Sequence, residues 1–127
     1  MKFLWPVRFY EPFWHADLVG ASDAAAEQAR RWRRRIVVLG GLPDDDTLKC
    51  DPDDDLVPLP KCLKVRIPDA RSADLKRSPW GAVLRGRGDT AGPYLYVVAF
   101  GLRHPEASSS IKLSVYATAH QRLFPAD

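Results

Sequence analysis

The residues of this 127-residue sequence best suited to chemistry are basic side chains that accompany one tyrosine and two histidines in its C-terminal half. Arginine and lysine bind phosphate and stabilise the charge of a pentacovalent phosphorus in a transition state. Histidine and tyrosine serve as general bases or acids. Because RNA carries its own 2′-hydroxyl nucleophile, such a set needs no metal, and we expect neither a metal site nor a cofactor. The set is, in chain order, Lys64, Arg66, Arg85, Arg87, Arg103, His104, Tyr116 and His120.

Two spacings in this set indicate shared faces. Lys64 and Arg66 alternate with apolar residues and therefore project from one face of a strand. Tyr116 and His120 are four apart, which places them on one face of a helix. Arg103 follows an apolar run at a point where the chain turns. The pattern predicts a phosphodiester site on a basic sheet face.

Each member also has an ordinary structural explanation. Lys64 and Arg66 could be solvated strand residues. Tyr116 could belong to the core with its hydroxyl at the surface, and His120 could pack beside the sheet. The residue types alone leave these alternatives open.

The elements that position these residues follow from periodicity. Alternating or continuous apolar residues predict strands within 3–10 and over 63–67, 80–85 and 94–102. Pro6 confines the first strand to a sheet edge or makes it start afterwards. The glycine-rich stretch 86–93 predicts a turn, and Gly101 ends or bulges the last strand. The short connections predict that the last three strands form an antiparallel meander.

The helices are bounded by polar caps and by glycine. Ser22 or Asp23 begins a helix that Gly40-Gly41 ends, and residues 15–18 form either an earlier turn or part of the same helical arm. The apolar stripe of this helix is Ala25, Ala29, Trp32, Ile36 and Leu39. Ser114 begins a short C-terminal helix, whose apolar side is Val115, Ala119 and Leu123.

The sequence therefore predicts one α+β domain over residues 1–127, a length that supports one hydrophobic core. A small antiparallel or mixed sheet packs on one face against the N-terminal helix or helical hairpin, and a short helix closes the chain. We expect the other sheet face to be free to carry polar residues.

Charge is distributed unevenly along the chain. Residues 44–55 hold seven aspartates and one lysine, a net of −6 against the chain's +3, which leaves about +9 on the other residues. A domain this basic suggests a polyanionic partner. The acidic segment lies within a proline-bearing loop predicted over 43–61.

Several classes are excluded by simple features. Cys50 and Cys62 are twelve apart, with no CxxC pair and no second pair of ligands, so we predict reduced thiols and no zinc site. The sequence contains no run of eighteen apolar residues, which is about the length that a membrane-spanning helix needs. The charged, proline-bearing start does not read as a signal peptide, so we expect a cytoplasmic protein without a membrane partner.

The C-terminal half carries an ordered series of motifs. These are LKVRIPDARSADLKRSPWGAVLRGRG, then YLYVVAFGLRHP with its G-x-R ending, then SVYATAHQRL. Their order and spacing resemble the RelE/ParE toxin superfamily over about 65 residues, and the N-terminal half agrees in layout. The resemblance implies a RelE-like fold.

The RelE branch of that family cleaves mRNA on the ribosome. The resemblance implies a type II toxin–antitoxin ribonuclease, a metal-independent hydrolase whose partners are the ribosome, its mRNA and a cognate, acidic antitoxin. By position it assigns substrate binding to Lys64 and Arg66 and catalysis to Arg103 and Tyr116, with His104 able to replace tyrosine in proton transfer.

The chain departs from the family pattern at Gly81, where RelE-like chains usually carry an arginine. Arg85 lies on the same strand face and could partly replace that charge. The acidic loop and the long stretch 105–113 are further departures.

Two other functions remain open from the sequence. One is a non-catalytic member of the same fold, either a ParE-like gyrase inhibitor or a domesticated binding module for protein or nucleic acid. The other is an interaction protein that works through the arginine-rich helix, Arg30–Arg35, or the aspartate-rich loop.

Overall fold

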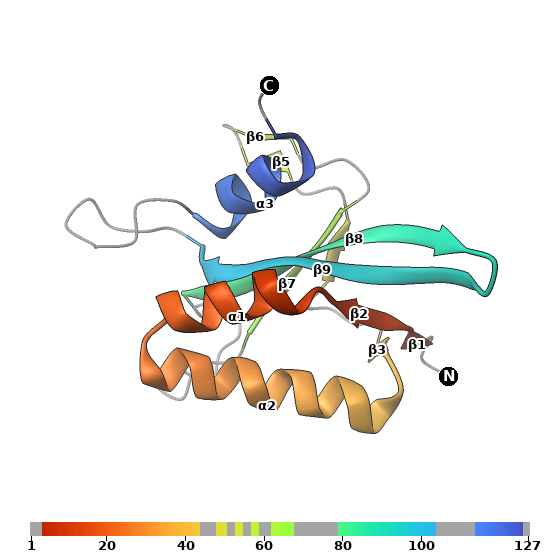
Figure 1. The fold of residues 1–127 in the computed structure, drawn as a ribbon, viewed down its shortest axis with the longest axis horizontal. Helices are drawn as coiled ribbons and strands as arrows, with labels where there is room; N and C mark the ends of the chain where they lie inside the picture. The colour runs from red at the N-terminus through yellow and green to blue at the C-terminus, as the bar shows by residue number, and fades with distance from the viewer. Residues whose placement is uncertain are drawn as a thin grey trace.

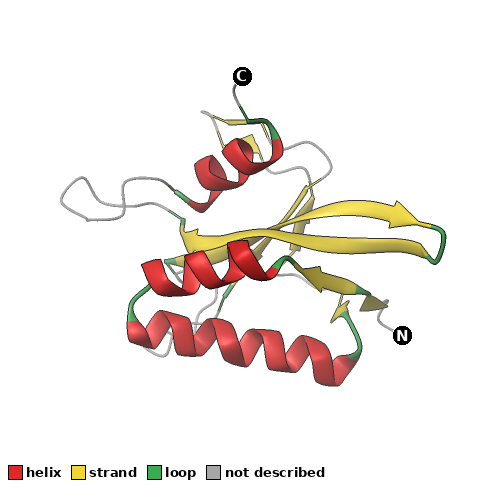
Figure 2. Ribbon diagram, viewed as in Figure 1, coloured by secondary structure: helices red, strands yellow, loops and turns green. Residues whose placement is uncertain are grey.

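The computed structural model describes residues 4–43, 48–50, 53–54, 57–58, 62–67, 79–103 and 114–125. Over these residues the chain is an α+β protein with helices on both faces of a mixed sheet (Figures 1 and 2). The described helices are α1 (Glu11–Gly20), α2 (Asp23–Leu39) and α3 (Val115–Leu123).

The main sheet has the strand order β2-β9-β8-β7-β4 in the described part of the chain. Its strands are β2 (Val7–Phe9), β4 (Leu48–Cys50), β7 (Cys62–Arg66), β8 (Trp80–Asp89) and β9 (Gly92–Leu102). The predicted antiparallel meander is confirmed, because β7 pairs with β8 and β8 with β9 in antiparallel register.

Two edge strands complete that sheet. Strand β2 begins after Pro6, as predicted, and pairs in parallel with β9. Strand β4 pairs antiparallel with β7, so the prediction of an uninterrupted loop over 43–61 is wrong at Leu48–Cys50. Sequence alternation is too short there to reveal a strand that is stabilised by its neighbour.

Short strand pairs lie outside the main sheet. Strand β1 (Leu4–Trp5) pairs antiparallel with β3 (Leu42–Pro43), which ties the start of the chain to the end of α2. Strand β5 (Asp53–Asp54) also pairs antiparallel, with β6 (Val57–Pro58), at the end of the acidic segment.

The helical hairpin α1–α2 covers one face of the sheet. Ser22 caps α2 by accepting the amide of Ala25 at 3.2 Å, and Gly40 ends it in the left-handed region at φ 79°. The predicted stripe is buried except for Leu39, which is exposed beyond the sheet edge. Helix α1 includes residues 15–18, which agrees with the alternative that they belong to a helical arm, and it extends beyond them on both sides. A proline in its first turn favours its start.

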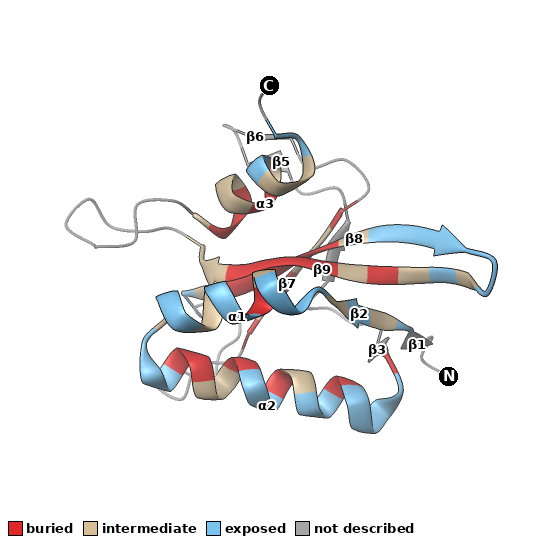
Figure 3. Cartoon of the chain, viewed as in Figure 1, coloured by how far each residue is buried: buried red, intermediate tan, exposed pale blue. Residues whose placement is uncertain are grey.

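Helix α3 covers the opposite face, so the expectation of a free polar face is wrong. Ser114 caps this helix by accepting the amide of Ala117 at 3.1 Å. A second hydrophobic cluster fills the space between α3 and the sheet; its buried members are Cys62, Val83, Val98, Ala99, Val115, Tyr116 and Ala119. The sheet is buried near its centre and exposed along the outer part of β8 (Figure 3).

A bulge in β9 is compensated by polar side chains from both helical layers. Register with β8 shifts between Val83 and Leu84, so the bulge lies near Val98 rather than at Gly101. Beyond the end of β2, Asp17 of α1 accepts the amide of Phe100 at 2.9 Å. Arg122 of α3 donates to the carbonyl of Val98 at 2.9 Å. These two contacts satisfy backbone groups of β9 at a point where β2 no longer pairs with it.

The β8–β9 hairpin is longer than the sequence predicted. Strand β8 continues through the glycine-rich stretch to Asp89, and the turn is Thr90–Ala91. Glycines 86 and 88 pair in the ladder instead of forming the predicted turn, and the left-handed residue is Gly92 at φ 123°. None of the helices in the described ranges has the length and apolarity needed to cross a membrane.

Candidate functional site

The structure brings four of the predicted site residues together at the end of the sheet where β8 begins and β9 ends. Lys64 and Arg66 lie on β7, Arg103 follows β9, and Tyr116 lies in the first turn of α3. We call these four residues the cationic cluster. It lies on the sheet face that α3 covers, so its cations border the second hydrophobic core.

Gly81 makes room for Arg103 of the cationic cluster. Arg66 lies opposite Gly81 of β8, which in turn lies opposite Gly101 of β9. A Cβ atom at position 81 would come within 3.1 Å of Cγ of Arg103 and of the carbonyl oxygen of Val65. Glycine at 81 therefore lets the side chain of Arg103 lie across the sheet, which explains why the arginine expected there by resemblance is absent.

Tyr116 holds two cations of the cluster in place. Its side chain is 1% exposed, and its hydroxyl accepts a hydrogen bond from Nε of Arg103 at 3.2 Å. The Nζ atom of Lys64 lies 4.8 Å from the centre of the tyrosine ring, within cation–π distance. Tyr116 thus has the geometry of a positioning residue whose hydroxyl and ring orient two different cations.

Arg66 carries a buried donor for which the described part of the chain offers no acceptor. Its Nε atom is buried and has no hydrogen-bond partner among the residues the structure describes. Such groups are rare in folded proteins, because an unmade buried hydrogen bond costs about 1–3 kcal/mol. Beside Lys64 and Arg103, this donor is suited to an anion such as a phosphate oxygen.

The remaining predicted residues lie farther along the same face or beyond the described chain. Arg85 lies opposite Cys62, and its guanidinium is 5.6 Å from the ring of Phe124. Arg87 is exposed on the β8–β9 hairpin. His120 packs against Phe124, with 5.2 Å between ring centres, and His104 lies outside the described residues.

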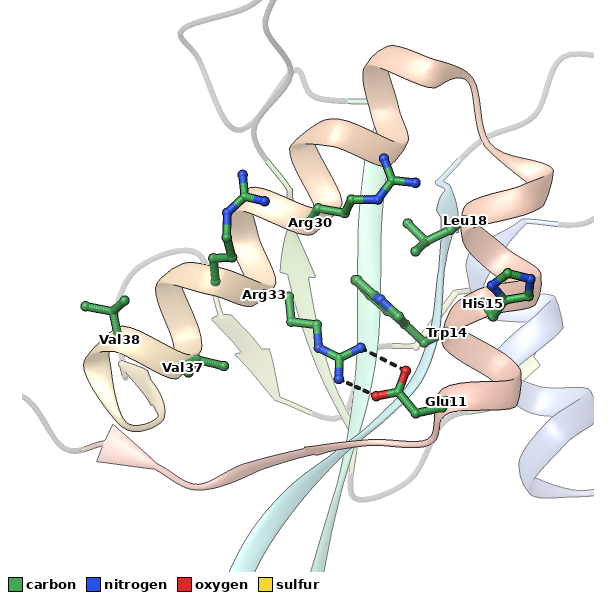
Figure 4. A pocket seen from close by; sticks show the side chains of 9 residues that line it. Glu11, Trp14, His15, Leu18, Arg30, Arg33, Val37 and Val38 are labelled. Carbon is green, nitrogen blue, oxygen red and sulfur yellow. Dashed lines mark hydrogen bonds and ion pairs between the residues drawn. The ribbon is translucent and has the colours of Figure 1, made fainter.

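The arginines of α2 face a different surface. Arg33 donates to the carboxylate of Glu11 in α1, which lowers the pKa of Glu11 below its ordinary value. Glu27 pairs with arginines on the exposed side of the helix. Between α1 and α2 lies a groove of about 570 Å³ (Figure 4); it is lined by Glu11, Trp14, His15, Leu18, Arg30, Arg33, Arg34, Val37 and Val38.

Sequence reasoning missed the role of Gly81. The signal available was the Trp80-Gly81 pair at the start of a strand, since an interior glycine often marks a close approach by another group. The approaching group, Arg103, is 22 positions away in the sequence and becomes a neighbour only through strand pairing. Within the described ranges no three histidine, cysteine, aspartate or glutamate side chains are grouped as metal ligands.

Fold and site together define a class: an α+β protein with a mixed sheet between helical layers and a basic cluster under its last helix. Comparisons of the chain with family models, with curated proteins and with solved structures found no match.

Proposed function

We propose that this chain is a RelE-like, ribosome-dependent mRNA endoribonuclease and the toxin of a type II toxin–antitoxin pair. The observation that carries the proposal is the buried Nε donor of Arg66, which has no acceptor among the described residues and lies beside Arg103 and Lys64. Three cations at one end of a sheet match the charge of a phosphodiester that gains negative charge in its transition state.

The proposed reaction is a transesterification within the RNA. The 2′-oxygen forms a bond to the adjacent phosphorus, and the bond from phosphorus to the 5′-oxygen breaks. A general base takes the 2′-hydroxyl proton, and a general acid gives a proton to the leaving 5′-oxygen. Arg66, Arg103 and Lys64 hold the non-bridging oxygens, which leaves a cyclic phosphate and a free 5′-hydroxyl as products.

Tyr116 enters this proposal as a positioning residue. Its hydroxyl is buried and engaged with Arg103, which favours a role in aiming that guanidinium over a role in proton transfer. His104 and His120 remain the predicted proton-transfer groups. His120 is half-buried one turn along α3 from Tyr116.

A second function is favoured by the same burial of Tyr116. In this alternative the chain keeps the fold and the cationic cluster but binds its target without cutting it, as a ParE-like inhibitor or a domesticated module does. The cluster then holds a phosphate as a static ligand. The two functions differ in whether RNA is cleaved.

The partner implied by the proposal is an acidic antitoxin. The groove between α1 and α2 supports such a partner, because Val37 and Val38 are 71% and 85% exposed beside Arg30 and Arg34. An amphipathic segment with acidic flanks would cover the valines and pair with the arginines. Burial of both valines would also remove an exposed apolar patch.

The proposal is tested with purified protein, translating ribosomes and a defined mRNA, with cleavage mapped by primer extension. The parent should cut ribosome-bound mRNA, and Arg103→Ala should lower the rate about 100-fold or more through loss of transition-state stabilisation. Tyr116→Phe should lower it less, with an unchanged pH profile, because the ring that contacts Lys64 remains. Arg31→Ala, on the exposed side of α2, is the control for charge.

Two results would count against nuclease activity. One is intact mRNA with the parent protein, which would favour the binding module. The other is growth arrest on induction in bacteria by Arg103→Ala and Tyr116→Phe as strong as that by the parent.

A further inference from the structure

The β8–β9 hairpin presents a surface that is separate from the proposed cleavage site. Past Arg85 of β8 and Leu95 of β9, the last residues that pair with β7 and β2, the hairpin extends beyond the rest of the sheet as a two-stranded ribbon. It is exposed along much of β8 (Figures 1 and 3). Asp89 fixes its tip by accepting the amide of Ala91 at 2.9 Å and by pairing with Arg8 at 2.7 Å. These two contacts lower the pKa of the Asp89 carboxyl, with the hydrogen bond from Ala91 as the larger cause.

Strand register places the ribbon's functional side chains on one face. Arg85 lies opposite Tyr96 and Arg87 lies opposite Tyr94. Arg8 of β2 lies opposite Tyr96 from the other side. Because directly paired residues project to the same side of a sheet, all five share the face that α3 covers farther along.

The opposite face of the ribbon's outer half is nearly bare. Strand β8 contributes Gly86 and Gly88 there; β9 contributes Leu95, which is buried opposite Gly86, and Pro93 opposite Gly88. The ribbon therefore has one smooth side and one side that carries arginine and tyrosine. Solubility does not explain this one-sided arrangement, because polar residues on either face of the ribbon would make it equally soluble.

The arginines of this face lie over aromatic rings. The guanidinium of Arg8 is 4.0 Å from the ring centre of Tyr94, and that of Arg87 is 4.5 Å from the ring centre of Tyr96. Partial burial raises the pKa of the Tyr96 hydroxyl above its ordinary value. Charge and flat aromatic surface thus alternate along the ribbon.

We propose that this face of the ribbon, formed by Arg8, Arg85, Arg87, Tyr94 and Tyr96, is a platform for single-stranded RNA. Bases stack on aromatic rings and on guanidinium planes, while arginines bind the phosphates between them. An acidic peptide would engage the guanidiniums but leave the ring faces unused. The choice of RNA as the ligand rests on the proposed function, whereas the platform itself rests on the ribbon geometry.

The platform lies along the same sheet face as the cationic cluster. Arg85 and Tyr96 lie one register step beyond Leu84, between the ribbon tip and the second hydrophobic core. A strand bound along the ribbon would therefore be directed toward Lys64 and Arg103. The platform would add affinity that is independent of the groups at the cleavage site.

The test measures binding of a fluorescent single-stranded RNA of about 12 nucleotides by anisotropy. Tyr94→Ala and Arg87→Ala should each weaken binding about 10-fold, because each removes a stacking surface or a phosphate contact. Arg31→Ala is the matched control and should bind as the parent does. Single-stranded DNA and duplex RNA of the same sequence are the competing ligands.

The outcomes separate this inference from the proposed nuclease. Equal affinity of the parent, Tyr94→Ala and Arg87→Ala would overturn the platform, as would equal binding of duplex and single-stranded RNA. Arg87→Gln repeats the test at an exposed site if Tyr94→Ala fails to fold. Ribbon-dependent RNA binding by a protein that leaves ribosome-bound mRNA intact would support the platform and refute the nuclease.

Discussion

The buried Nε atom of Arg66 lowers the stability of the fold, and this loss of stability points to a function for the residue. Its buried Nε donor lacks a partner among the described residues, and the next positions across the sheet are Gly81 and then Gly101. A phosphate oxygen that displaces the groups covering this donor would supply its missing hydrogen bond. Functional sites often retain groups that stability alone would not favour.

Replacement of Arg66 should therefore separate stability from binding. We expect Arg66→Met to leave the free energy of unfolding unchanged or raise it by about 1 kcal/mol, because an unsatisfied buried donor is removed and the aliphatic stem is kept. The same change should weaken RNA binding about 10-fold, through the loss of a charge-assisted hydrogen bond. Urea unfolding and anisotropy measure the two effects.

Arg31→Met controls for the loss of one exposed charge in both measurements. A fall of more than about 1 kcal/mol in the stability of Arg66→Met would mean that the guanidinium has a structural partner. In that case the anion site would have to be assigned to Arg103 and Lys64 alone.

At the scale of elements, one ion pair joins the helical layers around the edge of β9. Asp17 of α1 and Arg122 of α3 make paired contacts of 2.8 Å, with side chains 10% and 17% exposed. Both also bond to the backbone of β9 where β2 has ended. The guanidinium of Arg122 further lies 4.3 Å from the ring centre of Phe13.

Loss of Arg122 should destabilise the whole domain. We expect Arg122→Met to lower the free energy of unfolding by about 3 kcal/mol, since Asp17 would keep a largely buried charge without its partner. The double variant Asp17→Asn/Arg122→Met should recover part of that loss, because asparagine is neutral and still accepts the amide of Phe100. Urea unfolding of the single and double variants gives the coupling.

The exposed pair Arg31–Glu27 is the comparison, and Arg31→Met should change stability by less than about 0.5 kcal/mol. An equally small effect of Arg122→Met would show that solvent screens the Asp17–Arg122 pair as it screens a surface one.

At the scale of the whole molecule, basic groups are divided between the two helical layers. The cationic cluster and the arginine- and tyrosine-bearing face of the ribbon are on the side of the sheet that α3 covers. The arginine-rich helix α2 lies on the other side (Figure 1). The proposed RNA and the proposed acidic partner therefore contact different layers. Both can bind one copy of the protein through surfaces that do not overlap.

The salt dependence of RNA binding should report which layer contacts RNA. Each phosphate contact with a single strand contributes about −0.7 to the slope of log affinity against log salt concentration. We expect Lys64→Met to reduce the steepness by about that amount, and Arg31→Met, with the same net charge, to leave it unchanged. Anisotropy titrations at several salt concentrations measure the slopes; equal reductions would mean that binding is diffuse over both layers.

Much of this arrangement follows from local sequence. Alternation around Lys64 and Arg66 predicted a strand with both cations on one side, and serine caps predicted the starts of α2 and α3. Short connections predicted the antiparallel meander. These features depend on a few adjacent residues, whose periodicity and capping act within one element.

Contacts between elements were decided only by the tertiary structure. Alternation assigns side chains to a face but does not say what covers it, so the packing of α3 and the burial of Tyr116 were not predictable from the strands. Gly81 is understood only once pairing brings Arg103 over it, and the ribbon face only once register sets Arg87 beside Tyr94. Such contacts join residues far apart in sequence, and their energy depends on register and packing, which no local pattern specifies.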